Sequence, residues 1–288
     1  MMIDRLYEEV NKKGNVCVGL DTRLDYVPMW LRERYQDIDE VIFQFNKRII
    51  DATIDIVPIY KPQIAFYEAY GIKGLMAYKR TLEYIRENNS ISIGDIKRGD
   101  ISSTAEMYGK AHFEGDFEAD FITLNPYMGL DSITPYIRYI EEKGKGVFVL
   151  LRTSNPGAKD IQYLNVEGSK TLYYHVGDRL NEMASQYIGK CGYSSIGIVV
   201  GGTHIDEARE IRSRYGNMFF LIPGYGHQGA KGEDVALYLN HGNGGVVNSS
   251  RGIITAYKKY DDGEENFDSY ARKAVLAMRE DIGNEKGL

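Results

Sequence analysis

Short apolar runs alternate with longer amphipathic segments along the whole chain. Short apolar runs bounded by glycine or polar residues are typical of buried strands, whereas apolar residues spaced by three and four predict helices. The pattern predicts strands at 16–20, 56–60, 91–96, 120–124, 147–151, 196–200, 219–222 and 245–248. It predicts helices at 37–53, 72–88, 103–115, 131–143, 171–189, 204–215, 233–241 and 266–282.

Eight strands alternating with eight helices favour an α/β fold, the (β/α)8 or TIM barrel. No composition break divides the chain, so residues 1–288 are expected to form a single domain. A doubly wound sheet is the main alternative. The barrel makes a sharper prediction, because its active site lies at the strand C-termini and its phosphate site follows strands seven and eight. Candidate residues do follow the predicted strand ends: Asp21, Lys61, Asp95, Lys97, Ser154, Gln228 and Arg251.

Composition narrows the class of protein. The chain is 43% hydrophobic and 26% charged, which is ordinary for a soluble globular protein, and its net charge of −6 argues against a general nucleic-acid surface. Cys17 and Cys191 lack metal-like or redox spacing and are expected to be free thiols in a reducing compartment. Residues 1–14 lack the apolar core of a signal peptide, and runs such as 146–151 are too short to span a bilayer. These features predict a cytoplasmic protein.

The third predicted strand ends in charged residues. Side chains alternate between the faces of a strand, so Ile91, Ile93, Asp95 and Lys97 are expected to share one side. Two apolar residues would then lie deep on that face, with a carboxylate and an ammonium group at its C-terminal rim. This arrangement suits an active site better than a core.

The second predicted strand repeats the pattern, with Val57, Ile59 and Lys61 expected on one face. In a closed barrel Lys61 would meet the Asp95–Lys97 pair at one mouth, and Asp100 would add a second carboxylate. A purely structural ion-pair network is the alternative. Such a network stabilises a protein little compared with apolar packing, so we favour a catalytic role.

Two loops suggest ligand binding. Residues 224–229 match GxGxxG, but the motif follows the seventh strand and no acidic residue lies about 20 positions on, which argues against a dinucleotide site. Backbone N–H groups, Arg251 and Gln228 could instead bind a phosphate. Ser154 could hydrogen-bond a substrate or simply belong to the Ser-Asn-Pro-Gly turn. The five histidines show no metal-ligand spacing.

Six segments together resemble the orotidine 5′-phosphate decarboxylase family, most closely its longer branch found in many bacteria. They span nearly the whole chain in the family's order. The segments are Gly-Leu-Asp at 19–21, Lys-Pro-Gln-Ile-Ala-Phe at 61–66, Asp-Ile-Lys-Arg-Gly-Asp-Ile-Ser-Ser-Thr at 95–104, Thr-Ser-Asn-Pro-Gly-Ala at 153–158, Pro-Gly-Tyr-Gly-His-Gln-Gly at 223–229 and Asn-Ser-Ser-Arg-Gly-Ile at 248–253. His227 departs from the small residue expected there, but it is not a catalytic position of the family.

The resemblance implies catalytic roles for residues of the charged strand. Lys97 would protonate the pyrimidine carbon that loses carbon dioxide, and Asp95 would lie beside the substrate carboxylate. Lys61 would join this charged network. Asp100 would reach across a dimer interface into the partner's site, followed by Thr104, which would contact the partner's ribose.

The resemblance also implies how the substrate, orotidine 5′-monophosphate, is held. Asp21 would bind ribose hydroxyls together with Lys61, and Ser154 would bind the amide edge of the pyrimidine. Gln228 and Arg251 would hold the phosphate. The family is a homodimeric barrel that uses no metal and no organic cofactor, and its product is uridine 5′-monophosphate.

Two other functions stay open. Relatives that share the Asp-x-Lys-x-x-Asp strand act on sugar phosphates as metal-dependent decarboxylases or aldolases. Lys61 argues against that chemistry, because an acidic residue is expected there to help hold a metal. The second alternative is a non-catalytic nucleotide-binding protein on the same scaffold. Because every expected charged residue is present, a decayed site is the weaker interpretation.

Overall fold

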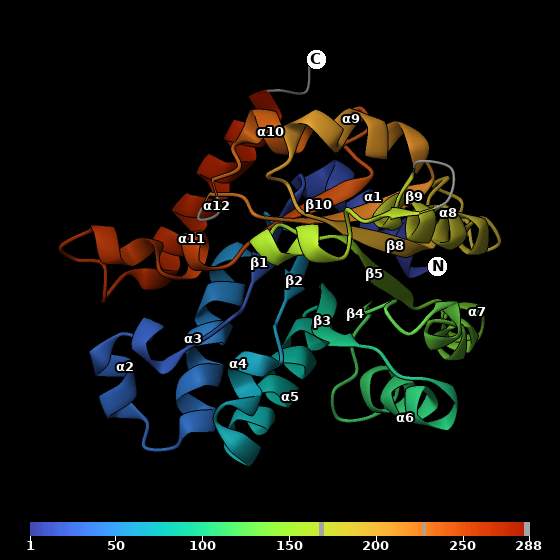
Figure 1. Cartoon of the computed structure of the whole chain (residues 1–288). Helices are drawn as coiled ribbons and strands as arrows, with labels where there is room; N and C mark the ends of the chain where they lie inside the picture. The colour runs from blue at the N-terminus through green and yellow to red at the C-terminus, as the bar shows by residue number, and fades with distance from the viewer. Residues whose placement is uncertain (167–169, 227–228, 285–288) are drawn as a thin grey trace.

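Eight parallel strands close into a barrel in the computed structural model, which describes residues 1–166, 170–226 and 229–284. Figure 1 shows the barrel with its helices arranged around the outside. The barrel strands are β1 (Val16–Gly19), β2 (Ile59–Lys61), β3 (Ile91–Arg98), β4 (Phe121–Leu124), β5 (Gly146–Arg152), β8 (Ser194–Val200), β9 (Met218–Pro223) and β10 (Gly245–Ser249). Each strand pairs with its neighbours in chain order, and β1 pairs with both β2 and β10, which closes the sheet. The predicted (β/α)8 barrel is confirmed.

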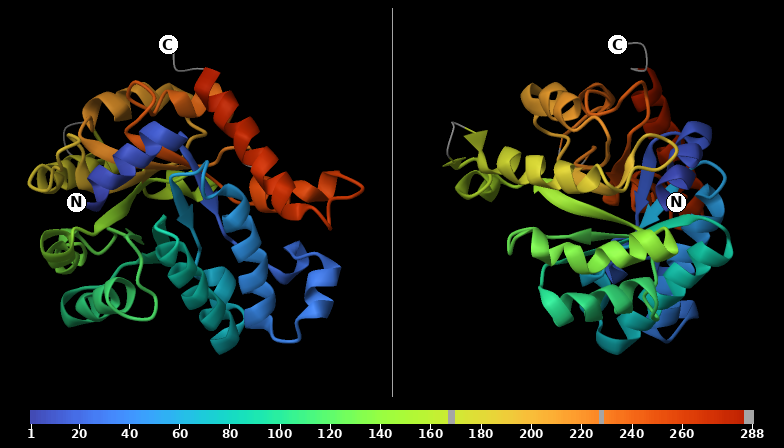
Figure 2. Two further views of the ribbon diagram at one scale, coloured as in Figure 1. Left: turned by 180° about the vertical axis from the view of Figure 1, so that it is seen from behind. Right: turned by 90° about the vertical axis from the view of Figure 1, so that its right-hand side faces the viewer.

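The helices form the outer layer, as the two views in Figure 2 show. The α-helices are α1 (Met2–Lys13), α2 (Met29–Arg34), α3 (Ile38–Thr53), α4 (Ala65–Glu68), α5 (Gly71–Glu87), α6 (Ser102–Phe113), α7 (Ile137–Lys143), α8 (Leu172–Ala184), α9 (Ile205–Arg214), α10 (Gly232–Ala236), α11 (Arg251–Ile254) and α12 (Phe267–Asn284). The 3₁₀ turns are Leu24–Tyr26, Leu130–Ser132, Thr134–Tyr136, Pro156–Asp160 and Ala256–Lys259. The short strands β6 (Asn165–Val166) and β7 (Lys170–Thr171) pair in antiparallel fashion outside the barrel.

Two predicted boundaries are wrong for identifiable reasons. Strand β2 begins at Ile59, not at residue 56, because the backbone N–H groups of Ile56 and Val57 still bond to the carbonyl of Thr53 at the end of α3. Val57 therefore packs in the outer core instead of sharing a face with Ile59. Helix α7 is shorter than 131–143, since Pro135 lies in the 3₁₀ turn that precedes it and cannot donate an intrahelical hydrogen bond.

The core has two layers. One lies between the barrel and its helices and includes Val18, Ile42 and Phe45. The other fills the barrel interior and is closed at the N-terminal end of the strands by α1, a helix that the sequence interpretation did not include. Its apolar face reaches the interior residues contributed by the strands. These are Ile3, Leu6 and Val10 from α1 with Cys17, Ile59, Ile91, Ile93, Phe121, Phe148, Phe219 and Val246 from the strands.

Within the described residues, no helix combines the length and the apolar character that crossing a membrane requires. The described residues belong to one barrel with its covering helices. Residues 285–288 lie outside them, so assigning the whole chain to one domain stays a prediction.

Candidate active site

A cavity of about 560 Å³ opens at the C-terminal ends of the barrel strands. Its floor is a layer of side chains that mostly lie two positions beyond residues of the interior core, as alternation along a strand requires. The layer consists of Lys61 (β2), Asp95 (β3), Thr123 (β4), Leu150 (β5), Val199 (β8), Leu221 (β9) and Asn248 (β10). The polar members come from β10 round to β4 and the apolar ones from β5 to β9. The cavity therefore has a charged side and an apolar side.

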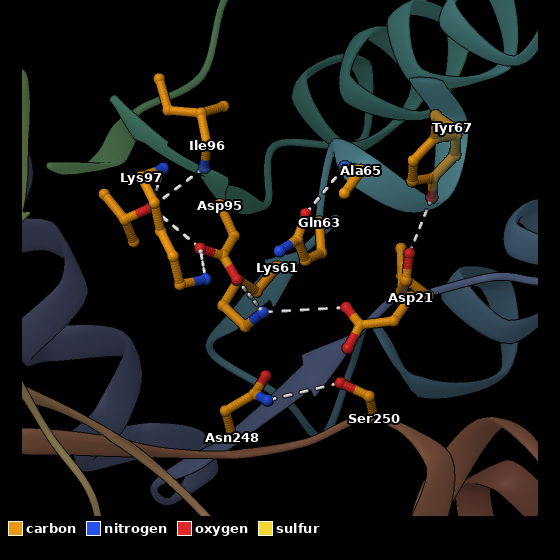
Figure 3. Close-up of polar contacts among 12 residues, drawn as sticks. Asp21, Lys61, Gln63, Ala65, Tyr67, Asp95, Ile96, Lys97, Asn248 and Ser250 are labelled. Carbon is orange, nitrogen blue, oxygen red and sulfur yellow. Dashed lines mark hydrogen bonds and ion pairs between the residues drawn. The ribbon is translucent and has the colours of Figure 1, made fainter. Parts of the chain in front are cut away.

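A chain of alternating charges crosses the charged side (Figure 3). The Lys61 Nζ lies 2.8 Å from Asp95 Oδ2 and 3.7 Å from Asp21 Oδ1. The Lys97 Nζ lies 2.6 Å from Asp95 Oδ1, the other oxygen of the same carboxylate. The predicted meeting of Lys61, Asp95 and Lys97 at one mouth is confirmed. Within a single chain, Asp21 supplies the second carboxylate of the series and Asp100 does not.

The burial of these groups is uneven. The side chains of Lys61 and Asp95 are only 6% and 7% exposed, whereas that of Lys97 is 44% exposed. Two members of the network are thus fixed inside protein, while Lys97 extends into the cavity from their edge. An exposed ammonium group held by one buried carboxylate can reach a ligand in the cavity.

Electrostatics keep the buried pair ionised. Burial alone would raise the pKa of Asp95, but the ammonium groups of Lys61 and Lys97 outweigh it and hold that pKa well below its ordinary value. Burial alone would lower the pKa of Lys61, but Asp21 and Asp95 outweigh it and raise that pKa above its ordinary value. The site therefore presents fixed charges of both signs at neutral pH.

Several predicted binding residues also line the cavity. Asp21 follows β1, Ser154 follows β5 and Arg251 begins α11 after β10, so each lies at a strand C-terminus as predicted. The glycine-rich loop contributes Gly224, which has a φ of 114° that favours glycine. Gln228, the other predicted phosphate ligand, lies outside the described residues.

Asp100 and Thr104 are not among the residues that line this cavity. The Asp100 carboxylate accepts a hydrogen bond from the backbone N–H of Ile101, and Thr104 is exposed on α6. Among the described residues Asp100 has no ion-pair partner. Their predicted place in a partner's site stays a prediction.

Sequence reasoning missed two polar residues of the cavity floor. Thr123 donates a hydrogen bond to Asp95 Oδ1 at 2.8 Å, and the Asn248 amide donates to Ser250 Oγ at 3.4 Å. The two-residue alternation that placed Asp95 after Ile93 would also have placed Thr123 after Phe121 and Asn248 after Val246. The period of two along β4 and β10 is therefore the signal that indicates both residues.

No group of three or more His, Cys, Asp or Glu side chains among the described residues is arranged to hold a metal ion. At the mouth, the position between Asp21 and Asp95 is taken by the ammonium group of Lys61.

Comparisons with known proteins identify the family of this chain. Residues 14–265 match the profile of the orotidine 5′-phosphate decarboxylase / HUMPS family. The chain is 72% identical to the orotidine 5′-phosphate decarboxylase of Petrotoga mobilis over 289 residues, covering 100% of both chains. It is 60% identical to that of Clostridium novyi, covering 99% of each. The structure of Leishmania donovani OMP decarboxylase superimposes with a TM-score of 0.74 at 30% identity, covering 96% of this chain and 98% of that one.

The profile match spans most of the chain, and both curated relatives are matched along essentially their whole length. The six segments recognised in the sequence supply Asp21, Lys61, Asp95, Ser154 and Arg251 to the cavity. The chain therefore belongs to the orotidine 5′-phosphate decarboxylase / HUMPS family, in its longer branch.

Proposed function

We propose that this cavity binds orotidine 5′-monophosphate and decarboxylates it without a cofactor, with Lys97 as the proton donor. The family makes the chain a carboxy-lyase that forms uridine 5′-monophosphate in pyrimidine nucleotide synthesis. The observation that carries the mechanism is the Lys61–Asp95–Lys97 network, with Lys97 extending from it into the cavity.

In the proposed binding mode, the two ends of the substrate contact different parts of the cavity. The phosphate lies against the loops after β9 and β10, where Arg251 provides a bidentate donor and Gly224 allows close approach of the backbone. Asp21 and Lys61 hold ribose hydroxyls, and Ser154 contacts the amide edge of the pyrimidine. This orientation directs the carboxylate-bearing carbon toward Asp95 and Lys97.

The reaction then depends mainly on the fixed charges of the site. The bond between the ring carbon and the carboxylate breaks, carbon dioxide leaves, and the electron pair stays on the ring carbon. The Lys97 ammonium stabilises this developing negative charge and transfers its proton to the carbon, after which Lys97 takes up a proton from water. Asp95 holds the Lys97 ammonium group in place through their 2.6 Å contact. Burial in protein strengthens these interactions relative to water.

The apolar side of the cavity complements the charges. Leu150, Val199 and Leu221 line it and belong to, or pack against, the apolar core of the barrel. A surface without hydrogen-bonding groups solvates a carboxylate poorly and tolerates neutral carbon dioxide. A carboxylate placed between Asp95 and this apolar surface is poorly solvated, so its loss as neutral carbon dioxide is favoured.

A second copy of the chain completes the proposed site. Asp100 and Thr104 lie outside the chain's own cavity, and the surrounding segments expose large apolar side chains. These exposed residues are Ile101, Met107, Tyr127 and Met128. Apolar patches of this kind mark protein–protein contacts. A homodimer that buries them would place Asp100 of each subunit beside Lys97 of the other.

Turnover of orotidine 5′-monophosphate by purified protein, followed by ultraviolet absorbance, tests the function. We expect full activity in EDTA. Loss of activity in EDTA would favour the metal-dependent sugar-phosphate chemistry of related barrels, and binding without turnover would favour a nucleotide-binding protein.

Both cysteines are free thiols, which fits the expected cytoplasmic location.

Subunit mixing tests the shared site. Asp100→Ala and Lys97→Ala homodimers should both be inactive. Their heterodimer should regain activity, because one of its two sites has a wild-type Asp100 and a wild-type Lys97. Absence of recovery in heterodimers verified by mass spectrometry would show that Asp100 acts within its own chain or not at all.

A further inference from the structure

The pairing of β3 with β4 is interrupted beside the catalytic residues. Gly94 pairs with Ile122 and Arg98 pairs with Leu124, so three residues of β3, 95–97, face one residue of β4, Thr123. Lys97, within this bulge, has a φ of 46°, a left-handed conformation that is unfavourable for a residue other than glycine. Strain of this kind persists only where the surroundings enforce it.

The bulge removes backbone groups from the sheet ladder, and one side chain satisfies them. The Thr123 Oγ1 accepts hydrogen bonds from the backbone N–H groups of Ile96 and Lys97, both at 2.9 Å. The same oxygen donates its proton to Asp95 Oδ1 at 2.8 Å. One donor and two acceptor positions are the full capacity of a hydroxyl, so this group has no bond left for substrate. Thr123 is 1% exposed.

These contacts act on both charged residues at once. The backbone bond fixes the conformation from which the Lys97 side chain starts, and the carboxylate bond fixes the oxygen that Lys97 contacts. In a regular strand, residues two apart lie on the same face about 6.6 Å apart along the chain, so their side chains can meet, but the strand alone does not fix the geometry of that contact. The bulge and the hydrogen bonds of Thr123 therefore fix the geometry in which Lys97 contacts Asp95 at 2.6 Å.

We propose that Thr123 is a positioning residue, which holds the bulge so that Lys97 and Asp95 meet the substrate in a fixed geometry. The inference rests on the proposed function, because it assigns Thr123 a part in proton delivery by Lys97. It does not make Thr123 a substrate ligand. Its hydroxyl should therefore affect turnover and leave the affinity for the phosphate and ribose ends unchanged.

Three substitutions separate the hydroxyl from the volume of the side chain. Thr123→Val keeps the shape and removes all three hydrogen bonds, and kcat should fall about 10²-fold, as for other small displacements of catalytic groups. Thr123→Ala leaves room for a water molecule and should be intermediate. Thr123→Ser keeps the hydroxyl and should approach the wild-type kcat. KM and the affinity for uridine 5′-monophosphate should stay near wild type in all three.

Thr53→Val is the matched control. Thr53 is also buried, and its hydroxyl bonds the Ile49 carbonyl and Tyr60 on the outer side of the barrel. This variant should lose stability without losing kcat. Equal kcat in Thr123→Val and wild type, or equal losses in Thr123→Val and Thr123→Ser, would overturn the proposal.

Amide hydrogen exchange gives a readout independent of activity. The amides of Ile96 and Lys97 should exchange about tenfold faster in Thr123→Val and at the wild-type rate in Thr123→Ser, because each loses its acceptor only in the first variant. Unchanged amide exchange in Thr123→Val would refute the proposal that Thr123 holds the bulge, even if catalysis were impaired. Absence of turnover by the wild type would instead refute the proposed function, and the exchange experiment would still decide the role of Thr123.

Discussion

The two ends of the barrel interior are built from the same strands but have opposite chemistry. At the N-terminal end, Leu6 of α1 packs on Ile59 and Ile91 in an apolar core. At the C-terminal end, two residues beyond Ile59 and Ile93, the same face carries Lys61 and Asp95. One alternating face thus stabilises the fold at its N-terminal end and carries the proposed catalytic charges at its C-terminal end.

The comparison shows that the apolar end of the interior stabilises the fold and that the charged end contributes little stability. Burying an apolar side chain contributes about 1.5–3 kcal/mol, with no partner required. Burying Lys61 and Asp95 incurs a desolvation cost that their attraction only roughly repays. The closed end should therefore control unfolding, and the mouth should control turnover.

Removing Lys97 should have the largest effect, and on turnover alone. Lys97→Ala loses the proposed proton donor, so kcat should fall about 10⁴-fold. Stability should change little, because Asp95 keeps Lys61 and Thr123 as partners. Steady-state kinetics and thermal unfolding measure the two effects, with Lys79→Ala on exposed α5 as the control. A kcat within tenfold of wild type, or an equal loss of product affinity, would contradict the assigned role.

Truncating Leu6 should give the opposite result. Leu6→Ala opens a cavity under the barrel and should cost about 3–4 kcal/mol of unfolding free energy. The kcat per folded molecule should stay at the wild-type value, since α1 is at the far end from the cavity. Urea unfolding and active-site titration measure these quantities, and exposed Glu8→Ala on the same helix is the control. Loss of kcat in the folded fraction would show that the two ends are coupled.

Converting the mouth into an apolar layer sharpens the comparison. Lys61→Met alone leaves a buried carboxylate with fewer partners and should cost about 3 kcal/mol. Adding Asp95→Leu should restore most of this loss, because no buried charge is then left unpaired. Both variants should be inactive. Chemical denaturation of the single and double variants tests this, and a double variant less stable than the single one would mean that the ion pair itself stabilises the barrel.

The loss of unfolding free energy in mild acid should come from a residue outside the barrel interior. Burial and the nearby Arg98 lower the pKa of His112, on α6, to about 4. The unfolded chain therefore takes up the proton first as the pH falls below 6.5, and the folded state should lose about 2 kcal/mol between pH 7 and pH 5. Asp95 contributes stability above its ordinary pKa of 3.8, which is lost only as the pH falls toward its lower folded-state pKa.

The variant His112→Phe separates these contributions. Its unfolding free energy should be nearly constant between pH 7 and pH 5, whereas the wild-type value declines. His241→Phe provides the control for a histidine on the surface. A decline that persists in His112→Phe would have to be assigned to another group.

The barrel and the charged part of the site could be predicted from alternation alone. Ile93 followed by Asp95 and Lys97 needed only the period of a strand. The spacing of Ile3, Leu6 and Val10 is equally regular and indicates a helix, although α1 is absent from the predicted elements. Alternation could also have indicated Thr123.

Other features depend on contacts that no local pattern encodes. The bulge at 95–97 is a matter of register between β3 and β4, so the hydrogen bonds of Thr123 could not be predicted. The contacts of Lys61 with both Asp21 and Asp95 depend on which strands become neighbours when the barrel closes. The proposed placement of Asp100 in a partner's site depends on a second chain.

The seam between β1 and β10 sets an order of events during synthesis. Asn15 bonds the carbonyl of Gly245, 230 positions later in the chain. At 5–20 residues per second, β1 leaves the ribosome roughly 10–50 s before its second neighbour exists. Throughout that interval one edge of β1 is open to other nascent chains. Asp21 has then been synthesised, but Arg251 has not. Arg251, the proposed phosphate ligand, follows the last barrel strand, so the proposed phosphate site is complete only when the barrel can close.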